Sequence, residues 1–327
     1  MKITSVGPFD GISRMVLGGG GIGQVWGETD VESAYETLDA ALSAGINLLD
    51  MAPGYRKAQS ILGNYFGGSW PSNVRVTSKE WIGQKKPEEY YSHLRVSVET
   101  SLKTLGISKL DLFFLHNEIC PEGYRYPKQS GDPIGFSTPW QDYIASVVPA
   151  FEKLKSEGLI EHWGLTGTGH PDAIISALRH EAKPSVVQVN TNLLDSPGNL
   201  ARFDGPAKPR EILKAAKDNH VGTLGIRILQ AGALTSSFDR SVDRSDPNYR
   251  DYVRAAPFRS LCADMNWDVA ATALRYALSM DHVDAVVLGT KNLAELKQSL
   301  DAEKLPPLSA NEIKKIDESV LKTSKER

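Results

Sequence analysis

Four ionisable residues stand at or just after the ends of three apolar stretches. Asp50 closes INLLD, Lys79 closes VRVTSK and His116 closes LDLFFLH, while Tyr55 follows Asp50 by five positions. A phenol has a pKa near ~10, and a nearby ammonium lowers it, so Lys79 could tune Tyr55 for proton transfer at neutral pH. Asp50 would hold Lys79 in place, and His116 would orient a carbonyl oxygen. This combination predicts a site that protonates a carbonyl oxygen.

Each of these residues also has an explanation without catalysis. Asp50 could cap a following helix, Lys79 could point into solvent, and His116 could be a buried core imidazole. Polar residues that close three successive apolar stretches favour the catalytic interpretation. Because the sequence shows no metal-ligand cluster and no activated nucleophile, the electron source that we expect is hydride from a nicotinamide cofactor.

The elements that must position these residues begin with eight short apolar stretches. The expected strands are Met15–Gly18, Ile46–Asp50, Val74–Lys79, Leu110–His116, Ile160–Thr166, Val186–Asn190, Val221–Ile226 and Ala285–Leu288. Nearly continuous apolar strands are typical of parallel sheets that are buried on both faces. Eight strand-and-helix units predict an α/β fold, a (β/α)8 TIM barrel, in which the strand ends converge on one pocket. A doubly wound sheet is the alternative at this level.

Amphipathic stretches lie between the strands and predict helices. Examples are Val31–Ala44, Pro87–Leu105, Trp140–Glu157, His170–His180, Pro209–Asn219 and Asn266–Met280, with an extra C-terminal helix at Leu308–Leu321. Side-chain oxygens near helix starts are expected to meet free backbone N–H groups, as at Asp30, Asp172, Asn266 and Asn292. No change in composition marks a second domain, so residues 1–327 are predicted to form a single domain.

Three connections are longer than a bare barrel needs. Residues 117–139, 191–208 and 231–260 each follow a strand, on the face where barrel enzymes build their sites. Long connections in a compact domain are usually functional, so we expect these loops to contribute to the site. Five arginines of the third loop could cover a cofactor pyrophosphate or form a solvated surface, namely Arg240, Arg244, Arg250, Arg254 and Arg259.

The segment LGGGGIG after the first expected strand contains a G-x-G-x-x-G pattern, formed by Gly18, Gly20 and Gly23. In a dinucleotide-binding Rossmann fold, this pattern opens directly into a helix. Here the first helix signal comes only at Asp30. We therefore interpret the segment as a flexible loop that lets a ligand approach the backbone.

The composition argues against several classes of protein. The 327 residues include 37 Lys plus Arg and 40 Asp plus Glu, for a net charge of −3, which gives no electrostatic support to a nucleic-acid binder. Two cysteines cannot form a disulfide framework, and no apolar segment is long enough for a membrane span or a signal peptide. We expect a cytoplasmic protein without membrane or nucleic-acid partners, and its oligomeric state stays open.

At the four ionisable residues, the sequence resembles the aldo-keto reductases. NLLDMAPGY, VTSKEW and DLFFLH are similar to the family's segments around its Asp, Tyr, Lys and His. Further similar segments follow in the same order, HWGLTGT, QVNTNLL, LQAGALTS and VVLGTKNLAELKQSL. The resemblance implies a (β/α)8 barrel and NAD(P)(H)-dependent oxidoreduction of a small aldehyde, ketone or sugar. The long segment after strand four and a non-aromatic residue at 226 resemble the sugar or pyridoxal dehydrogenase branch.

The resemblance also implies which residues contact ligands. Asp50, Tyr55, Lys79 and His116 are the catalytic set, and substrate would lie against Trp26, Tyr55, Trp81 and His116. Tyr124, Tyr126 and Phe136 of the first long loop could add a third side to the pocket. The implied cofactor contacts are Gly21, Asp50, Thr166, Gln188, Ile226, Arg227, Leu229, Gly232, Gly289, Thr290, Lys291 and Gln298.

The expected cofactor is NADP(H) in preference to NAD(H). Lys291 is the cation available to a 2′-phosphate, with Thr290 as a hydrogen-bond donor, although Glu295 lies close enough in sequence to repel that phosphate. The family commonly has Ser-Asn where this chain has Thr166-Gly167, and Ile226 replaces an aromatic ring that often stacks on the nicotinamide. The aliphatic side chain still offers a packing surface.

Two hypotheses from other classes stay open. One is a barrel that binds nicotinamide as a sensor or accessory subunit with little turnover. The other is a metal-dependent hydrolase that uses Asp50, His116 and His170. The second lacks a close ligand cluster such as H-x-H.

Overall fold

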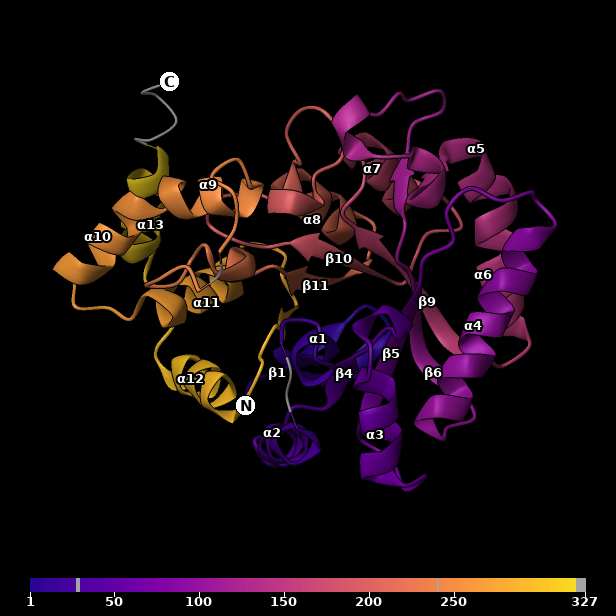
Figure 1. Ribbon diagram of the computed structural model, residues 1–327, viewed down its shortest axis with the longest axis horizontal. Helices are drawn as coiled ribbons and strands as arrows, with labels where there is room; N and C mark the ends of the chain where they lie inside the picture. Colours follow the sequence, from indigo (N-terminus) through magenta and orange to yellow (C-terminus); the bar gives the residue numbers. More distant parts are fainter. Residues whose placement is uncertain (28–29, 240, 322–327) are drawn as a thin grey trace.

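Eight parallel strands form a closed barrel in the computed structural model, which describes residues 1–27, 30–239 and 241–321 (Figure 1). The strands are β3 (Met15–Gly18), β4 (Leu48–Asp50), β5 (Arg75–Glu80), β6 (Leu110–Leu115), β9 (Ile160–Gly167), β10 (Val186–Asn190), β11 (Gly222–Ile226) and β12 (Ala285–Leu288). Hydrogen-bonded neighbours follow chain order around the ring, and β12 closes it against β3. The predicted TIM barrel is confirmed, and the doubly wound alternative is wrong.

The strands begin and end within two residues of the predicted positions. The largest difference is in β4, where Ile46 and Asn47 lie outside the strand. The Asn47 side chain instead bonds Ser13 N at 2.8 Å and Gly11 O at 2.7 Å, which ties this segment to the N-terminal hairpin. At the other end of the strands, β5 continues one residue past Lys79, and His116 directly follows β6.

Helices cover the outside of the barrel. They include α2 (Val31–Ser43), α3 (Ala58–Phe66), α4 (Glu89–Leu105), α6 (Val148–Ser156), α7 (Pro171–Arg179), α8 (Pro209–Asp218), α11 (Val269–Ser279), α12 (Leu293–Lys304) and α13 (Ala310–Leu321). Two expected caps are confirmed, since Asp30 accepts from Ser33 N and Asn292 accepts from Glu295 N. The other two are wrong, because the residues that cap α7 and α11 are His170 and Asp268.

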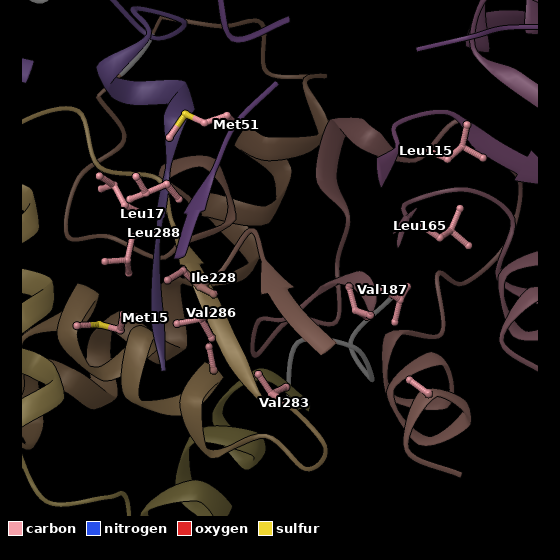
Figure 2. Close-up of a cluster of buried hydrophobic side chains, with 14 of the residues drawn as sticks. Met15, Leu17, Met51, Leu115, Leu165, Val187, Ile228, Val283, Val286 and Leu288 are labelled. Carbon is pink, nitrogen blue, oxygen red and sulfur yellow. The ribbon is translucent and has the colours of Figure 1, made fainter. Parts of the chain in front are cut away.

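The layer between strands and helices is apolar and buried. Figure 2 shows Met15 and Leu17 of β3 beside Val286 and Leu288 of β12, the residues that the register pairs across the closing seam. A second group in the same view joins Leu115, Leu165 and Val187 of three neighbouring strands. All seven side chains are at most 1% exposed. Burial of apolar surface contributes roughly 25 cal/mol per Å², so this layer fixes where the strands end.

An N-terminal hairpin that the sequence analysis did not predict packs against the barrel. β1 (Ile3–Val6) and β2 (Phe9–Ser13) pair antiparallel, and their Val6, Phe9 and Ile12 join the interior cluster. Gly7 adopts a positive φ of 54° and approaches the backbone of Ser185, where any side chain would overlap. The hairpin therefore sits at the strand ends opposite to those that carry Asp50 and His116.

The long connections contain regular secondary structure. Residues 117–139 include the paired short strands β7 (Glu118–Cys120) and β8 (Ser137–Pro139). Residues 231–260 contain α9 (Pro247–Arg254) and the start of α10 (Ala256–Asp264), which packs with α13 (Figure 1). The predicted helix Trp140–Glu157 is broken into α5 (Trp140–Asp142), a π-helical turn over Tyr143–Val147, and α6.

The glycine-rich segment after β3 also differs from the expectation. Gly19–Ile22 form the short helix α1, all of it buried, in place of a flexible loop. Gly21 lies so close to the Thr290 carbonyl that a Cβ atom would overlap it. These glycines therefore allow close backbone packing at the mouth of the barrel.

Candidate active site

Neighbouring strands bring the four ionisable residues together at one end of the barrel. β4 and β6 both pair with β5, so Asp50, Lys79 and His116 leave adjacent strand ends. The 3₁₀ turn η1 (Pro53–Tyr55) returns Tyr55 to the same place. Lys79 Nζ lies 2.7 Å from Asp50 Oδ2 and 3.2 Å from the Tyr55 hydroxyl.

Asp50 is the centre of a buried hydrogen-bond network. Its Oδ1 accepts from Thr77 Oγ1 at 2.9 Å and from Gln188 Nε2 at 2.8 Å, while Oδ2 accepts from Lys79. Both carboxylate oxygens are thus engaged with side chains from other strands. The geometry rules out the helix-cap role for Asp50.

Lys79 is the most deeply buried cation of this site, with its side chain 0% exposed. It also donates to Met51 O at 3.1 Å. Burial opposes the charge, but the Asp50 carboxylate and the Tyr55 hydroxyl outweigh burial and raise the pKa of Lys79. Lys79 therefore stays protonated, and the alternative of a solvated lysine is excluded.

The pKa of Tyr55 shifts in the direction opposite to the one that the sequence predicts. Burial is the largest influence and raises the pKa of Tyr55, the Lys79 ammonium lowers it, and Asp50 raises it. The net direction is upward because desolvation exceeds the attraction of the ammonium. The phenol is accordingly a protonated group with a cation beside it, which suits a proton donor.

His116 faces Tyr55 across the pocket, with the two ring centres 6.1 Å apart. Its backbone N–H donates to Glu80 O at 2.9 Å, and its ring lies 4.9 Å from the Trp81 ring. Burial, followed by the charge of Lys79, lowers the pKa of His116 to about 3. Its Nδ1 is buried and has no hydrogen-bond partner among the described residues. A neutral imidazole is thus positioned to hydrogen-bond a ligand.

The four residues lie at a cavity of about 730 Å³. Its lining also includes Trp26, Trp81, Glu118, Thr166, Thr168, Gln188, Asn199, Arg202, Ile226, Arg227, Leu229, Gly232, Asp239 and Gly289. Thr290, Lys291, Glu295 and Gln298, which follow β12 in the chain, also line it. Two predicted residues do not line it, because Lys79 lies below the surface and Gly21 packs on Thr290.

The aromatic residues of the first long loop do not wall the cavity. Tyr124, Tyr126 and Phe136 pack edge to face on one another, with ring centres 4.9 and 5.0 Å apart. That expected third side of the pocket is therefore wrong. The same loop contributes Glu118, and the connection after β10 contributes Arg202. Sequence reasoning did not single out either residue, although Glu118 follows His116 by only two positions.

The end of the cavity near Lys291 holds several polar groups. Lys291 Nζ pairs with Asp239 at 2.8 Å and with Glu295 at 3.4 Å. The Thr290 hydroxyl beside Lys291, and the Thr166 hydroxyl elsewhere in the cavity at the end of β9, are buried without a hydrogen-bond partner in the described part of the chain. Such unsatisfied groups cost free energy unless a ligand or water engages them, so they fit a polar ligand.

The arginines of residues 231–260 do not form the expected cover. Arg240 lies outside the described residues, and the other four do not line the cavity. Arg254 lies 3.8 Å from Asp251, and Arg259 lies over the Tyr252 ring. Arg227 does line the cavity and donates to Gln230 Oε1, Asn199 Oδ1 and Asn248 Oδ1.

The arrangement gives no support to a metal-dependent hydrolase. His170 caps α7 and packs between Tyr124 and Phe203, away from Asp50 and His116. Within residues 1–27, 30–239 and 241–321, no three His, Cys, Asp or Glu side chains gather as metal ligands would. In that same part of the chain, no helix has the length and apolar character to cross a membrane.

Comparisons with known proteins agree with this geometry. The chain is 23% identical over 322 residues to D-threo-aldose 1-dehydrogenase of Pseudomonas sp, with 89% of each chain covered. It is 25% identical to D-arabinose 1-dehydrogenase of Saccharomyces cerevisiae, covering 97% of this chain and 91% of the relative. An aldo-keto reductase from Bacillus halodurans in its holo form has the same fold, with a TM-score of 0.71 at 20% identity over 98% of this chain and 96% of that one. The model of the aldo/keto reductase family matches residues 14–321, so the chain belongs to this family and is an oxidoreductase.

Proposed function

We propose that the protein transfers hydride between a nicotinamide cofactor and a carbonyl or carbinol carbon of an aldehyde or sugar, with Tyr55 as the general acid and base. The observation that carries this proposal is the 3.2 Å contact between Lys79 Nζ and the Tyr55 hydroxyl at the cavity. Relatives named for D-threo-aldose, D-arabinose and L-galactose dehydrogenation support a sugar substrate.

The residues at the cavity fit a dinucleotide. The buried, unsatisfied hydroxyls of Thr166 and Thr290 offer hydrogen bonds. Gln188 donates from Nε2 to Asp50, and its Oε1 can accept from the cofactor carboxamide. Ile226, Leu229 and the glycines Gly232 and Gly289 give an apolar surface and close backbone approach along the same wall. Bound there, the cofactor supplies or accepts the hydride.

In the reduction direction, the Tyr55 hydroxyl donates its proton to the carbonyl oxygen as that oxygen gains negative charge. Lys79 stabilises the phenolate that remains, and Asp50 fixes Lys79 so that its charge does not move. Neutral His116 hydrogen-bonds the same oxygen and orients it. In the oxidation direction, phenolate takes the hydroxyl proton back. Trp26 and Trp81, which are 48% and 40% exposed, would flank the substrate.

We propose that NADP(H) is preferred over NAD(H), but only weakly. Lys291 is the cation that could meet a 2′-phosphate, yet it already pairs with Asp239 and Glu295. A phosphate would have to compete with both carboxylates for the ammonium. A contact with a charged group contributes about 1.5–3 kcal/mol, and two nearby carboxylates offset much of that.

The decisive experiment is a turnover assay of the purified protein with NADPH or NADH and a panel of aldehydes, and with NADP⁺ or NAD⁺ and a panel of aldoses. Turnover that disappears in Tyr55→Phe supports the proposed enzyme. Tight cofactor binding without turnover on either panel would instead favour the sensor or accessory subunit.

Both cysteines, Cys120 and Cys262, are buried and unpaired, which supports a cytoplasmic location for this activity.

A further inference from the structure

We propose that Glu118 and Arg202 form a second polar subsite of the same cavity, which binds neighbouring hydroxyl groups of a polyhydroxylated substrate. This inference rests on the proposed function, because it names the part of a sugar that this end of the cavity would recognise. The two residues come from separate connections, 117–139 after β6 and 191–208 after β10.

The subsite lies within reach of the reacting atoms. Glu118 follows His116 by two residues, and two residues of extended chain span at most roughly 7 Å. Trp81 links the two places, because its ring lies 4.9 Å from the His116 ring and 5.7 Å from the Arg202 guanidinium. A carbon chain of four to six atoms held by His116 at one end therefore brings hydroxyls to Glu118 and Arg202.

Both partners have unused hydrogen-bonding capacity. The Glu118 side chain is 4% exposed, and its Oε2 makes no hydrogen bond of ordinary length in the part of the chain that the structure describes, although the Tyr126 hydroxyl is near enough to lower the pKa of Glu118. Its other oxygen lies 3.8 Å from Arg202 Nε, which is longer than the 2.7–2.9 Å or so of a charge-assisted hydrogen bond. A buried carboxyl and a half-buried guanidinium, whose side chains are 4% and 34% exposed, do not satisfy each other and are suited to a ligand that satisfies both.

Backbone hydrogen bonds and a ring contact hold these residues in place. Glu118 N–H donates to Phe136 O at 3.0 Å within the β7–β8 pair. The Arg202 carbonyl accepts from Ser130 Oγ at 2.5 Å, and the Arg202 guanidinium lies 4.3 Å from the Phe136 ring centre. The two long connections are thus bonded to each other, so the subsite does not depend on one free loop.

The hydrogen-bonding pattern of the two side chains matches a pair of hydroxyl groups. Burial raises the pKa of Glu118 to about 8, while Arg202 and Tyr126 oppose this shift. Near neutral pH Glu118 can therefore both donate and accept, and Arg202 only donates. Hydroxyl groups also both donate and accept, so a vicinal diol can match the pair. A substrate carboxylate only accepts hydrogen bonds, so it would leave the acceptor oxygen of Glu118 unused.

The test compares substrates with and without hydroxyls. The ratio of kcat/KM for aldopentoses to kcat/KM for pentanal is measured in the parent, Glu118→Leu, Glu118→Gln and Arg202→Met. We expect this ratio to fall about ten- to a hundredfold in Glu118→Leu and Arg202→Met, through a rise in aldopentose KM. Glu118→Gln should lose less, because the amide also donates and accepts. Arg125→Met, an exposed arginine of the same connection outside the cavity, is the matched control.

A second measurement needs neither cofactor nor turnover. Binding of xylitol, ribitol and arabinitol to the cofactor-free protein is followed by tryptophan fluorescence, for which Trp81 is the expected reporter. At least one of these alditols should bind the parent and the Arg125→Met control equally, and bind Glu118→Leu about tenfold more weakly or worse.

The outcomes separate this subsite from the proposed reaction. An unchanged substrate ratio in all variants of an active enzyme overturns the subsite and leaves the oxidoreductase function. Alditol binding that depends on Glu118 in a protein with no turnover overturns the proposed function and leaves the subsite. Preference for an aldehyde that carries a carboxylate, lost in Arg202→Met, overturns the diol assignment in favour of an acidic substrate.

Discussion

The ammonium of Lys79 lies 2.7 Å from Asp50 Oδ2, and the two side chains are 0% and 3% exposed. Taking two charges out of water is costly, and a buried pair persists only where further hydrogen bonds satisfy it. Thr77 and Gln188 supply those bonds at Asp50, and Met51 O supplies one at Lys79. The pair therefore fixes a positive charge beside the Tyr55 hydroxyl, which a solvated lysine could not do.

Replacing Tyr55 with Phe should remove the proton donor and keep the ring in place. We expect turnover on the best substrate to fall by about 10²–10⁴, with dinucleotide affinity nearly unchanged in a fluorescence titration. Tyr143→Phe is a suitable control, because the Tyr143 hydroxyl is also buried but lies outside the cavity and has no hydrogen-bond partner among the described residues. If Tyr55→Phe keeps most of the parental kcat, another group is the acid.

Cofactor preference should respond in opposite directions to two changes at the same ion pair. Lys291→Ala should weaken the binding of NADPH by about ten- to a hundredfold. The binding of NADH should weaken far less, because only NADPH has the 2′-phosphate. Asp239→Asn removes a carboxylate that lies 2.8 Å from Lys291 Nζ. This change should strengthen the binding of NADPH relative to that of NADH. Calorimetric Kd values for both cofactors check this. Equal losses for both cofactors in Lys291→Ala would show that Lys291 does not contact the phosphate.

His116 should stay neutral throughout the working range of the enzyme. Burial and the Lys79 charge hold its pKa near 3, so its imidazole gains a proton only in strong acid. The pH profile of kcat should therefore show no change near the ordinary histidine value of about 6.5. A titration of the His116 ring by NMR checks this directly, and a measured pKa above about 6 would contradict it.

Glu118 should make the folded protein less stable as the pH rises. Its pKa is about 8 in the folded state, compared with an ordinary value of 4.5. The folded state thus binds the extra proton between these values, and the free energy of unfolding falls as pH increases through this window. Glu118→Gln removes this dependence, so its stability relative to the parent should rise by about 4 kcal/mol between pH 5 and pH 9. Denaturant titrations at both pH values measure the difference, and a constant difference would place the pKa of Glu118 near its ordinary value.

The sequence was sufficient to predict the barrel and the meeting of the four ionisable residues. Both depend on short-range patterns, since continuous apolar runs mark buried strands and a polar residue marks where each run leaves the core. The hairpin of β1 and β2 was missed because its residues become buried only against the finished barrel. For α9 a local signal did exist, since Asp246 precedes Pro247 and accepts from Asn248 N and Tyr249 N.

The sequence did not predict that Glu118 and Arg202 lie close together, for a different reason. They meet because the 117–139 and 191–208 connections bond to each other, through Ser130 Oγ to Arg202 O and through the Tyr124 hydroxyl to Asp204 N. Those contacts join residues 72 and 80 positions apart on irregular segments, where no periodic pattern exists. The pairing of Lys291 with Asp239 could not be predicted for the same reason, because it joins residues 52 positions apart on irregular segments.

Asp50→Asn is the change that tests the whole network, because an amide offers one acceptor where the carboxylate offers two. Lys79, Thr77 and Gln188 all donate to Asp50. With Asn at this position, the amide NH₂ must face at least one of these donors. We expect stability to fall by about 3–5 kcal/mol, as when one partner of a buried ion pair is removed.

The same change should also alter catalysis, in a way that a purely structural role would not. Without the carboxylate, Lys79 loses the charge that raises its pKa, so the pH profile of kcat should shift along with a fall in rate. Asp111→Asn is the matched control, since Asp111 pairs with Arg75 at 2.9 Å at the opposite end of the strands and is 21% exposed. That variant should lose some stability but keep the parental pH profile. An unaltered rate and profile in Asp50→Asn would remove Asp50 from the catalytic machinery, because the charge on Lys79 would then not depend on it.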